Sequence, residues 1–273
     1  MVPNLTLVCN LITLAICLIL PVLVILIFSL RNKGKKLPSA WLLGAAGFFV
    51  TQMLIRTPIL MVLQSQAWFA AFSQHHSFSY AFILAFTAGL FELAGRFVVA
   101  KLMSRNLTCK RSLAAGLGHG GIEAMLLVGA AYISNIVYIV AINNGTFDAM
   151  VAQAAQTGVD VSALWQAKDQ FLHSSPALFL LGGFERILAM ICHLAMSVIV
   201  CYGIHIGKPL RGAVLCLGIH TMIDLTAGIS LLIGNGLSQT AAYVIIYAIL
   251  TATSVVSILV IRKIRCCWQE TEE

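Results

Sequence analysis

The sequence has very little charge. Only 10% of its 273 residues are Asp, Glu, Lys or Arg, while 60% are hydrophobic and the mean hydropathy is +0.94. Ordinary soluble domains are about a quarter charged. So few charges exclude a water-soluble enzyme, a disordered chain and a nucleic-acid-binding domain, because each needs a polar or charged surface. The composition therefore indicates a polytopic membrane protein.

Several motifs of soluble enzymes are also missing. The sequence has no HExxH, which excludes the usual zincin arrangement, and no GxSxG elbow to activate a serine such as Ser197 near His193. Its eight cysteines include no CxxC pair, and several stand inside apolar runs. We therefore interpret them as small buried hydrophobes and not as a disulfide framework or a metal knuckle. There is no internal repeat and no low-complexity tract.

Long apolar runs dominate what is present. A membrane-spanning helix needs about 20 apolar residues, and seven stretches meet this: 5–30, 40–64, 78–103, 112–142, 177–202, 212–233 and 239–261. The sequence thus predicts an all-α polytopic membrane helix bundle of about seven transmembrane helices. We expect a single integral membrane domain over 1–273, with the lipid bilayer as its environment.

The basic residues predict the orientation. Thirteen of the 17 Lys and Arg fall in four clusters: Arg31, Lys33, Lys35, Lys36; Lys101, Arg105, Lys110, Arg111; Lys208, Arg211; and Arg262, Lys263, Arg265. Membrane proteins keep such clusters on the cytoplasmic side, facing anionic lipids. We therefore expect the N-terminus outside and the C-terminus in the cytoplasm. The polar segment 143–176 becomes an extracytoplasmic loop, with an apolar rhythm typical of a short interfacial helix.

Ionisable residues inside the spans are the main indication of function. Four of the ten acidic residues lie there, together with three histidines and two arginines: Glu92, Glu123, Glu185, Asp224, His119, His193, His220, Arg96 and Arg186. Each costs several kcal/mol in a bilayer and normally faces a partner in the bundle interior. Arg56, beside Pro58, is interpreted as structural or as snorkelling to the interface.

Their spacing predicts one shared site. Glu92 with Arg96, His119 with Glu123, and His220 with Asp224 are each four residues apart, so each pair shares a helix face. At about 1.5 Å per residue the groups lie roughly 10–18 Å from the cytoplasmic edge. Glycines around His119 permit close approach of neighbouring helices. A satisfied structural hydrogen bond explains any one of these residues, but it explains the whole set poorly.

Two chemistries fit such a site. A Glu in a partly dry cavity is a suitable general base for activating water, with histidines orienting the water or stabilising an oxyanion. Three histidines are alternatively a zinc site that leaves a position for water, with His119, His193 and His220 as candidate ligands. The residues alone leave the choice open.

The motifs resemble a known family. Phe91-Glu92-Leu-Ala-Gly-Arg96, Gly118-His119-Gly-Gly-Ile-Glu123-Ala, Phe184-Glu185-Arg186 followed by His193, and His220-Thr-Met-Ile-Asp224 are similar to the YhfC family of intramembrane metalloproteases. That family resembles the PrsW proteases and the CAAX-prenyl endopeptidases. The resemblance covers about 78–230 and implies that these helices form the catalytic core.

The resemblance also implies roles. Glu92 and Arg96 resemble the ExxxR of the CAAX-type motif, but Phe91 stands where a second Glu is usual. We therefore expect Glu123 to be the base in preference to Glu92. His119, His193 and His220 are expected to hold water, an oxyanion or a divalent metal such as zinc. Asp224 orients His220 or is a further ligand.

The expected function is an intramembrane endopeptidase of the bacterial plasma membrane. Its substrates would be membrane-embedded or membrane-associated proteins or peptides, with Glu185 and Arg186 supporting the site electrostatically and no role for nucleic acid. Two rivals remain open. One is a non-catalytic membrane scaffold, and the other is a proton-linked transporter, although the inverted repeats typical of transporters are not visible.

Overall fold

The computed structural model describes residues 1–158, 160–226, 228–229 and 236–270. Its helices are α1 (Asn4–Arg31), α2 (Leu37–Phe48), a π-helical segment (Phe49–Arg56), α3 (Thr57–Gln64), α4 (Ala67–His75), α5 (Ser77–Leu102), a 3₁₀ turn (Ser104–Asn106), α6 (Cys109–Glu123), a second π-helical segment (Ala124–Gly129), α7 (Ala130–Asn143), α8 (Phe147–Gln156), α9 (Ser162–His173), α10 (Leu178–His205), α11 (Pro209–Leu225) and α12 (Gln239–Glu270). The described residues form no strand, which confirms the all-α prediction.

Five helical segments are long and apolar enough to cross a membrane. They are Leu37–Gln64, Ser77–Leu102, Cys109–Asn143, Leu178–His205 and Gln239–Trp268. Each overlaps one of the predicted spans. The chain is therefore a polytopic helical membrane protein, as its composition indicated.

The first and sixth predicted spans are not among these five helical segments. α1 is bent by 40° between Asn4–Leu18 and Leu20–Arg31 and makes a sixth span if the two parts count as one. Pro21 lies at this bend, where it has no N–H to donate to the preceding turn. α11 has 17 described residues, and positions 227 and 230–233 of the expected span 212–233 lie outside the described residues. Seven spans, and their orientation, stay predictions.

The chain divides into two compact units. Unit 1 comprises Met1–Val22 and Ala124–Ile187, and unit 2 comprises Leu23–Glu123 and Leu188–Glu273. Both α1 and α10 contribute residues to each unit. The expected single domain and the core boundaries at 78–230 stay predictions.

Unit 1 joins the start of α1 to α7 and the start of α10 by polar contacts. The Asn135 amide on α7 donates to Asn10 Oδ1 on α1 at 3.1 Å. The hydroxyls of Thr13 and Tyr132 both donate to the carbonyl of Phe179, at 2.7 and 2.8 Å. Polar side chains inside membrane helices are held in this way because each otherwise lacks a partner in lipid.

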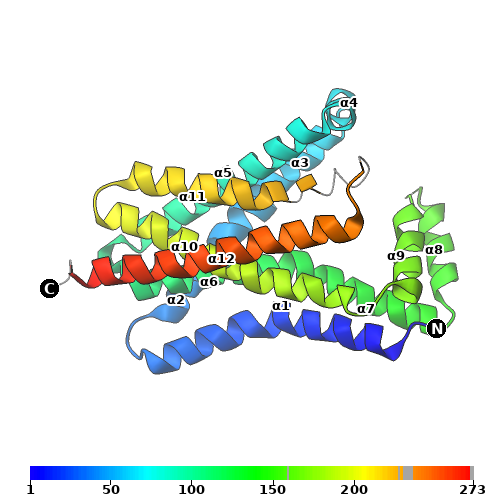
Figure 1. Ribbon diagram of the computed structural model, residues 1–273, viewed down its shortest axis with the longest axis horizontal. Coiled ribbons are helices and arrows are strands. Elements are labelled where there is room, and N and C mark those ends of the chain that lie inside the picture. The colour runs from blue at the N-terminus through cyan, green and yellow to red at the C-terminus, as the bar shows by residue number, and fades with distance from the viewer. Residues whose placement is uncertain (159, 227, 230–235, 271–273) are drawn as a thin grey trace. The chain divides into compact units, whose positions relative to one another are not determined.

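The segment 143–176, also in unit 1, contains two helices where the sequence indicated one. Figure 1 shows α8 and α9 beside each other, and their aromatic rings Phe147 and Trp165 are 6.0 Å apart. Lys168 of α9 donates to Asp148 of α8 at 2.5 Å. The loop therefore has a folded helical hairpin whose membrane side stays a prediction.

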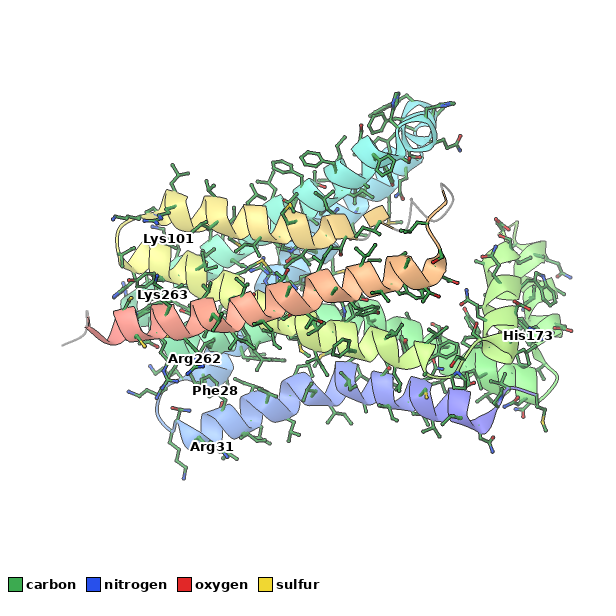
Figure 2. All side chains as sticks on the ribbon, viewed as in Figure 1. Phe28, Arg31, Lys101, His173, Arg262 and Lys263 are labelled. Atoms are coloured by element: carbon green, nitrogen blue, oxygen red, sulfur yellow. The ribbon has the colours of Figure 1, made fainter. Side chains whose placement is uncertain are left out.

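Unit 2 contains the predicted core motifs apart from Phe184-Glu185-Arg186, which belongs to unit 1. α11 runs alongside α5, and α2 packs against both α5 and α6 (Figure 1). Figure 2 shows Arg31, Lys101, Arg262 and Lys263 at the same end of unit 2. These side chains come from three of the four basic clusters. The charge rule requires that such clusters lie on one side of the membrane.

Glycines of α6 set how closely its neighbours approach. A Cβ on Gly118 would lie 1.9 Å from the carbonyl oxygen of Trp41 on α2, and one on Gly120 would lie 2.9 Å from Cβ of His193 on α10. No side chain fits at such distances, so only glycine permits these two contacts. The expectation of close helix approach around His119 is thus met by backbone contact with α2.

Gly118→Ala is expected to destabilise the protein by about 1–3 kcal/mol, because the new methyl must push α2 away from α6. Thermal unfolding in detergent, followed by tryptophan fluorescence, measures the change. Gly218→Ala on α11 is the matched control, since a Cβ there meets nothing within 4 Å. Equal unfolding temperatures for Gly118→Ala and the wild type would show that the contact is dispensable.

Candidate active site

The carboxylate of Glu92 lies at the centre of a buried polar cluster in unit 2. Its Oε2 is 2.9 Å from Nε2 of His119 on α6 and 2.7 Å from Nε2 of His220 on α11. Arg96, one turn further along α5, donates to the same oxygen from Nη1 at 3.1 Å. All four residues are buried. One oxygen atom therefore connects three helices.

His193 on α10 connects the cluster to Glu123. Its Nδ1 is 2.6 Å from Nη2 of Arg96, and its Nε2 is 2.8 Å from Oε2 of Glu123. A guanidinium only donates, so Nδ1 accepts, and in a neutral ring the hydrogen is on Nε2, which lies at ion-pair distance from Glu123. The ring of His193 also stacks on that of His119, with centroids 5.4 Å apart. Arg96 thus bridges Glu92 and His193.

Asp224 forms the more exposed side of the cluster. Its Oδ2 is 3.3 Å from Nδ1 of His220, and its side chain is 33% exposed, against 5% for Glu92. His220 consequently has a carboxylate oxygen near each ring nitrogen, one from Glu92 and one from Asp224. The polar groups continue without a break from the interior to a partly accessible residue.

Of the three pairs predicted from spacing, two contact each other and one makes its contacts across helices. His119 and Glu123 share a face of α6, yet His119 contacts Glu92 and Glu123 contacts His193. His220 and Asp224 do contact each other, and so do Glu92 and Arg96. The seven candidate residues other than Glu185 and Arg186 therefore come together in one cluster.

Glu185 and Arg186 belong to unit 1, where they pair with each other. Their expected electrostatic support of the site stays a prediction. Glu185 and Arg186 are neighbours in the sequence and pair with each other. Their spacing therefore does not indicate a shared helix face, as the four-residue spacing of the other pairs does.

Gln52 is a buried residue of this cluster that the sequence analysis missed. Its Nε2 donates to Oε1 of Glu92 at 3.0 Å and to the carbonyl of Ala88 at 3.1 Å. Arg56 donates from Nη1 to Oε1 of Gln52 at 3.3 Å and from Nη2 to the carbonyl of Leu84 at 2.7 Å. Arg56 therefore holds Gln52 in the orientation in which its amide donates to Glu92, and it does so inside the protein, not by snorkelling to the interface.

The local backbone explains how Gln52 reaches the site. Gln52 and Arg56 lie on the π-helical segment Phe49–Arg56, and a second π-helical segment begins directly after Glu123. Such wide turns are rare and are frequent at functional sites. A signal was present in the sequence, since a Gln four residues before an Arg stands inside the apolar stretch 40–64.

The donor types of the cluster fit a divalent metal. One ligand atom each from Glu92, His119 and His193 lies within 4.8 Å of the others, and all three residues are buried. Imidazole nitrogens and a carboxylate oxygen are ligands of zinc. This group differs from the expected three histidines, because Glu92 takes the place of His220. His119 Nδ1 is buried with no hydrogen-bond partner among the described residues, so one nitrogen of this ring is available to bind a ligand.

The fold and the cluster define a class: a polytopic membrane protein with a buried constellation of histidines and carboxylates. The chain belongs to the family described as YhfC intramembrane metalloprotease, whose model matches residues 16–250. It is 32% identical over 252 residues to the uncharacterized membrane protein YhfC of Bacillus subtilis (strain 168), which covers 92% of this chain and 94% of that relative. No solved structure matches. The predicted family is confirmed, and every residue of the cluster lies within the matched range.

Gln52→Leu is expected to lower the free energy of unfolding by about 1–3 kcal/mol, because Glu92 Oε1 and the carbonyl of Ala88 lose their buried donor. Gln64→Leu is the matched control, since the hydrogen bond of Gln64 to Tyr80 is exposed, and a change within about 0.5 kcal/mol is expected there. Chemical denaturation in mixed micelles measures both. Equal losses in the two variants would mean that Gln52 does not hold the carboxylate.

Proposed function

We propose that this protein is an intramembrane endopeptidase that hydrolyses peptide bonds of membrane-embedded or membrane-associated proteins. The observation that carries the proposal is the buried cluster of three histidines, two glutamates and an arginine, joined across four helices of a member of a metalloprotease family. Water activation and oxyanion stabilisation need these side chains in one place. A role in packing alone does not need so many ionisable groups in a bilayer.

The charges of the cluster support a cationic partner. Glu92, Glu123 and Asp224 contribute three negative charges when ionised. Arg96 contributes one positive charge in direct contact with Glu92, and Arg56 contributes a second that acts on Glu92 and Asp224. With neutral histidines the cluster therefore keeps a net negative charge. A bound cation or protonation of a histidine offsets this charge, and an uncompensated charge is costly inside a protein.

We assign the general base to Glu123. Both oxygens of Glu92 are already engaged, Oε1 by Gln52 and Oε2 by Arg96, His119 and His220. The side chain of Glu123 is 13% exposed, against 5% for Glu92. A water molecule therefore reaches the carboxylate of Glu123 more readily than that of Glu92.

In the proposed reaction, Glu123 removes a proton from a water molecule as its oxygen attacks the peptide carbonyl. Arg96 and the histidines stabilise the negative charge that develops on the carbonyl oxygen. Glu123 then returns the proton to the departing amine. His193 accepts from Arg96 and lies at ion-pair distance from Glu123, so it keeps the base and the guanidinium in fixed relative positions.

His119, His193 and Glu92 would hold a divalent metal such as zinc, with His220 as a further ligand. When bound, zinc supplies a Lewis acid that polarises a carbonyl and makes water a better nucleophile at neutral pH. Arg96 touches both Glu92 and His193, and it would balance the charge of the carboxylates around such a site.

The site lies inside membrane helices, so we infer that the substrate reaches it from the bilayer. A peptide bond within a helix is shielded by the helical hydrogen bonds, and the substrate must become locally extended before it is cleaved. The natural setting is the bacterial plasma membrane. The partly exposed Asp224 marks the side from which water or substrate enters.

A proton-linked carrier is the second candidate. One observation favours it: the titratable groups form a continuous path from Asp224 through His220, Glu92, Arg96 and His193 to Glu123. Such chains of carboxylates and histidines conduct protons in pumps and transporters. Proton flux in liposomes without peptide cleavage would favour the carrier.

Glu123→Gln is expected to lower the rate of cleavage of a transmembrane peptide library by about 100-fold or more, because the amide cannot accept the proton of water. Mass spectrometry of products formed by the protein in nanodiscs measures the rate. Asp169→Asn is the matched control, an acid-to-amide exchange on an exposed residue of α9. Full cleavage by Glu123→Gln would overturn the assignment of the base.

The purified protein is expected to carry about one zinc ion per chain, measured by inductively coupled plasma mass spectrometry, and to lose cleavage on chelation. His119→Ala should abolish metal binding. His173→Ala, which changes an exposed histidine of α9, should not. His220→Ala retains the metal if the ligands are Glu92, His119 and His193, and it loses the metal if the ligands are the three histidines. Metal-free protein that still cleaves would exclude zinc and leave a glutamate-type protease.

A further inference from the structure

A small cavity lies beside the cluster in unit 2, between α2, α5, α6 and α10. Its volume is about 10 Å³, which is close to the least that one water molecule needs. Three polar side chains line it: Arg96, His119 and Ser197. A cavity of this size has no room for a substrate, and these three side chains distinguish it from the wholly apolar empty cavities of protein cores.

Two of the lining residues have an unused polar atom. Nε of Arg96 and Nδ1 of His119 are inaccessible to solvent and have no hydrogen-bond partner in the part of the chain that the structure describes. The two residues are only 3% and 1% exposed. Buried polar atoms nearly always have a partner, and both of these atoms belong to residues that line the same cavity.

The two atoms are complementary. Nε of Arg96 carries a hydrogen and can only donate. His119 directs Nε2 at Glu92 Oε2 from 2.9 Å, and with the hydrogen on Nε2 its Nδ1 is an acceptor. A water oxygen accepts from the first atom and donates to the second, and the hydroxyl of Ser197 offers a third contact. About three hydrogen bonds are usual for a buried water.

We infer that the cavity binds one ordered water molecule, which bridges Nε of Arg96 and Nδ1 of His119 and is contacted by Ser197. A cation does not fit there, because the guanidinium of Arg96 lines the same space. Ser197 thereby acquires a role that the sequence did not show. It holds a solvent molecule and is not a nucleophile.

The bridging water has a consequence for His119, and this step rests on the proposed function. A histidine that binds a metal through one nitrogen usually donates the hydrogen on its other nitrogen to a carboxylate, a carbonyl or a water. No protein acceptor is available at Nδ1 of His119 among the described residues. Because a water molecule either donates or accepts, it allows His119 to present N–H to Glu92 or a lone pair to a metal.

Solid-state NMR of ¹⁵N-histidine-labelled protein in phospholipid vesicles tests the inference. His119 signals are assigned by their loss in His119→Gln. We expect magnetisation transfer from water protons to Nδ1 of His119 in the wild type. We expect its loss in Ser197→Val, which fills the cavity, and its retention in the matched control Ser197→Ala, which leaves the cavity open. Val99→Ile fills the same cavity from α5 if Ser197→Val does not fold.

An absent transfer to Nδ1 in the wild type would overturn the inference, and so would an unchanged transfer in the filled variants. The NMR measurement uses neither substrate nor metal. A failure of the proposed function would appear separately, as missing cleavage and missing zinc, while the water signal at His119 remained.

Discussion

The carboxylate of Glu92 is the group on which the rest of unit 2 depends. It lies in the interior of membrane helices, where an isolated charge is costly, and it is satisfied by side chains from four segments of the chain: Gln52, Arg96, His119 and His220. Breaking such an arrangement leaves an uncompensated buried charge, which destabilises a protein strongly. The helices that carry these donors are thus held in fixed relative positions by one acidic group.

Close packing of backbones makes this arrangement possible. Gly118 lets α6 touch the carbonyl of Trp41, and Gly120 makes room for His193 on the neighbouring helix. Helices in lipid gain little from hydrophobic burial, so they associate through small residues and polar contacts. The glycines of residues 118–124 and the ionisable residues beside them therefore act together. The glycines let the helices approach closely, and the ionisable side chains hold the helices together.

The proposed function depends on a difference between the two glutamates. Glu92 is buried and both its oxygens are engaged, while Glu123 is more accessible and is linked to Glu92 through His193 and Arg96. A carboxylate that organises donors and a second one that meets water are the parts that the proposed hydrolysis needs. Arg96 touches both halves, so its position couples the structural and the chemical part of the cluster.

The sequence by itself determined the membrane class, the positions of five of the seven expected spans and which ionisable residues share a helix face, because hydrophobic length and four-residue spacing are local properties of a chain. It did not show that His119 turns to Glu92 and Glu123 to His193, that Gln52 joins the cluster, that α8 and α9 form two helices, or that a water-sized cavity lies beside Arg96. Partners across helices depend on how each helix is rotated and how closely it packs. Those quantities are decided by tertiary contacts, such as the glycine contacts of α6 and the π-helical turn at Gln52, and not by spacing along one helix.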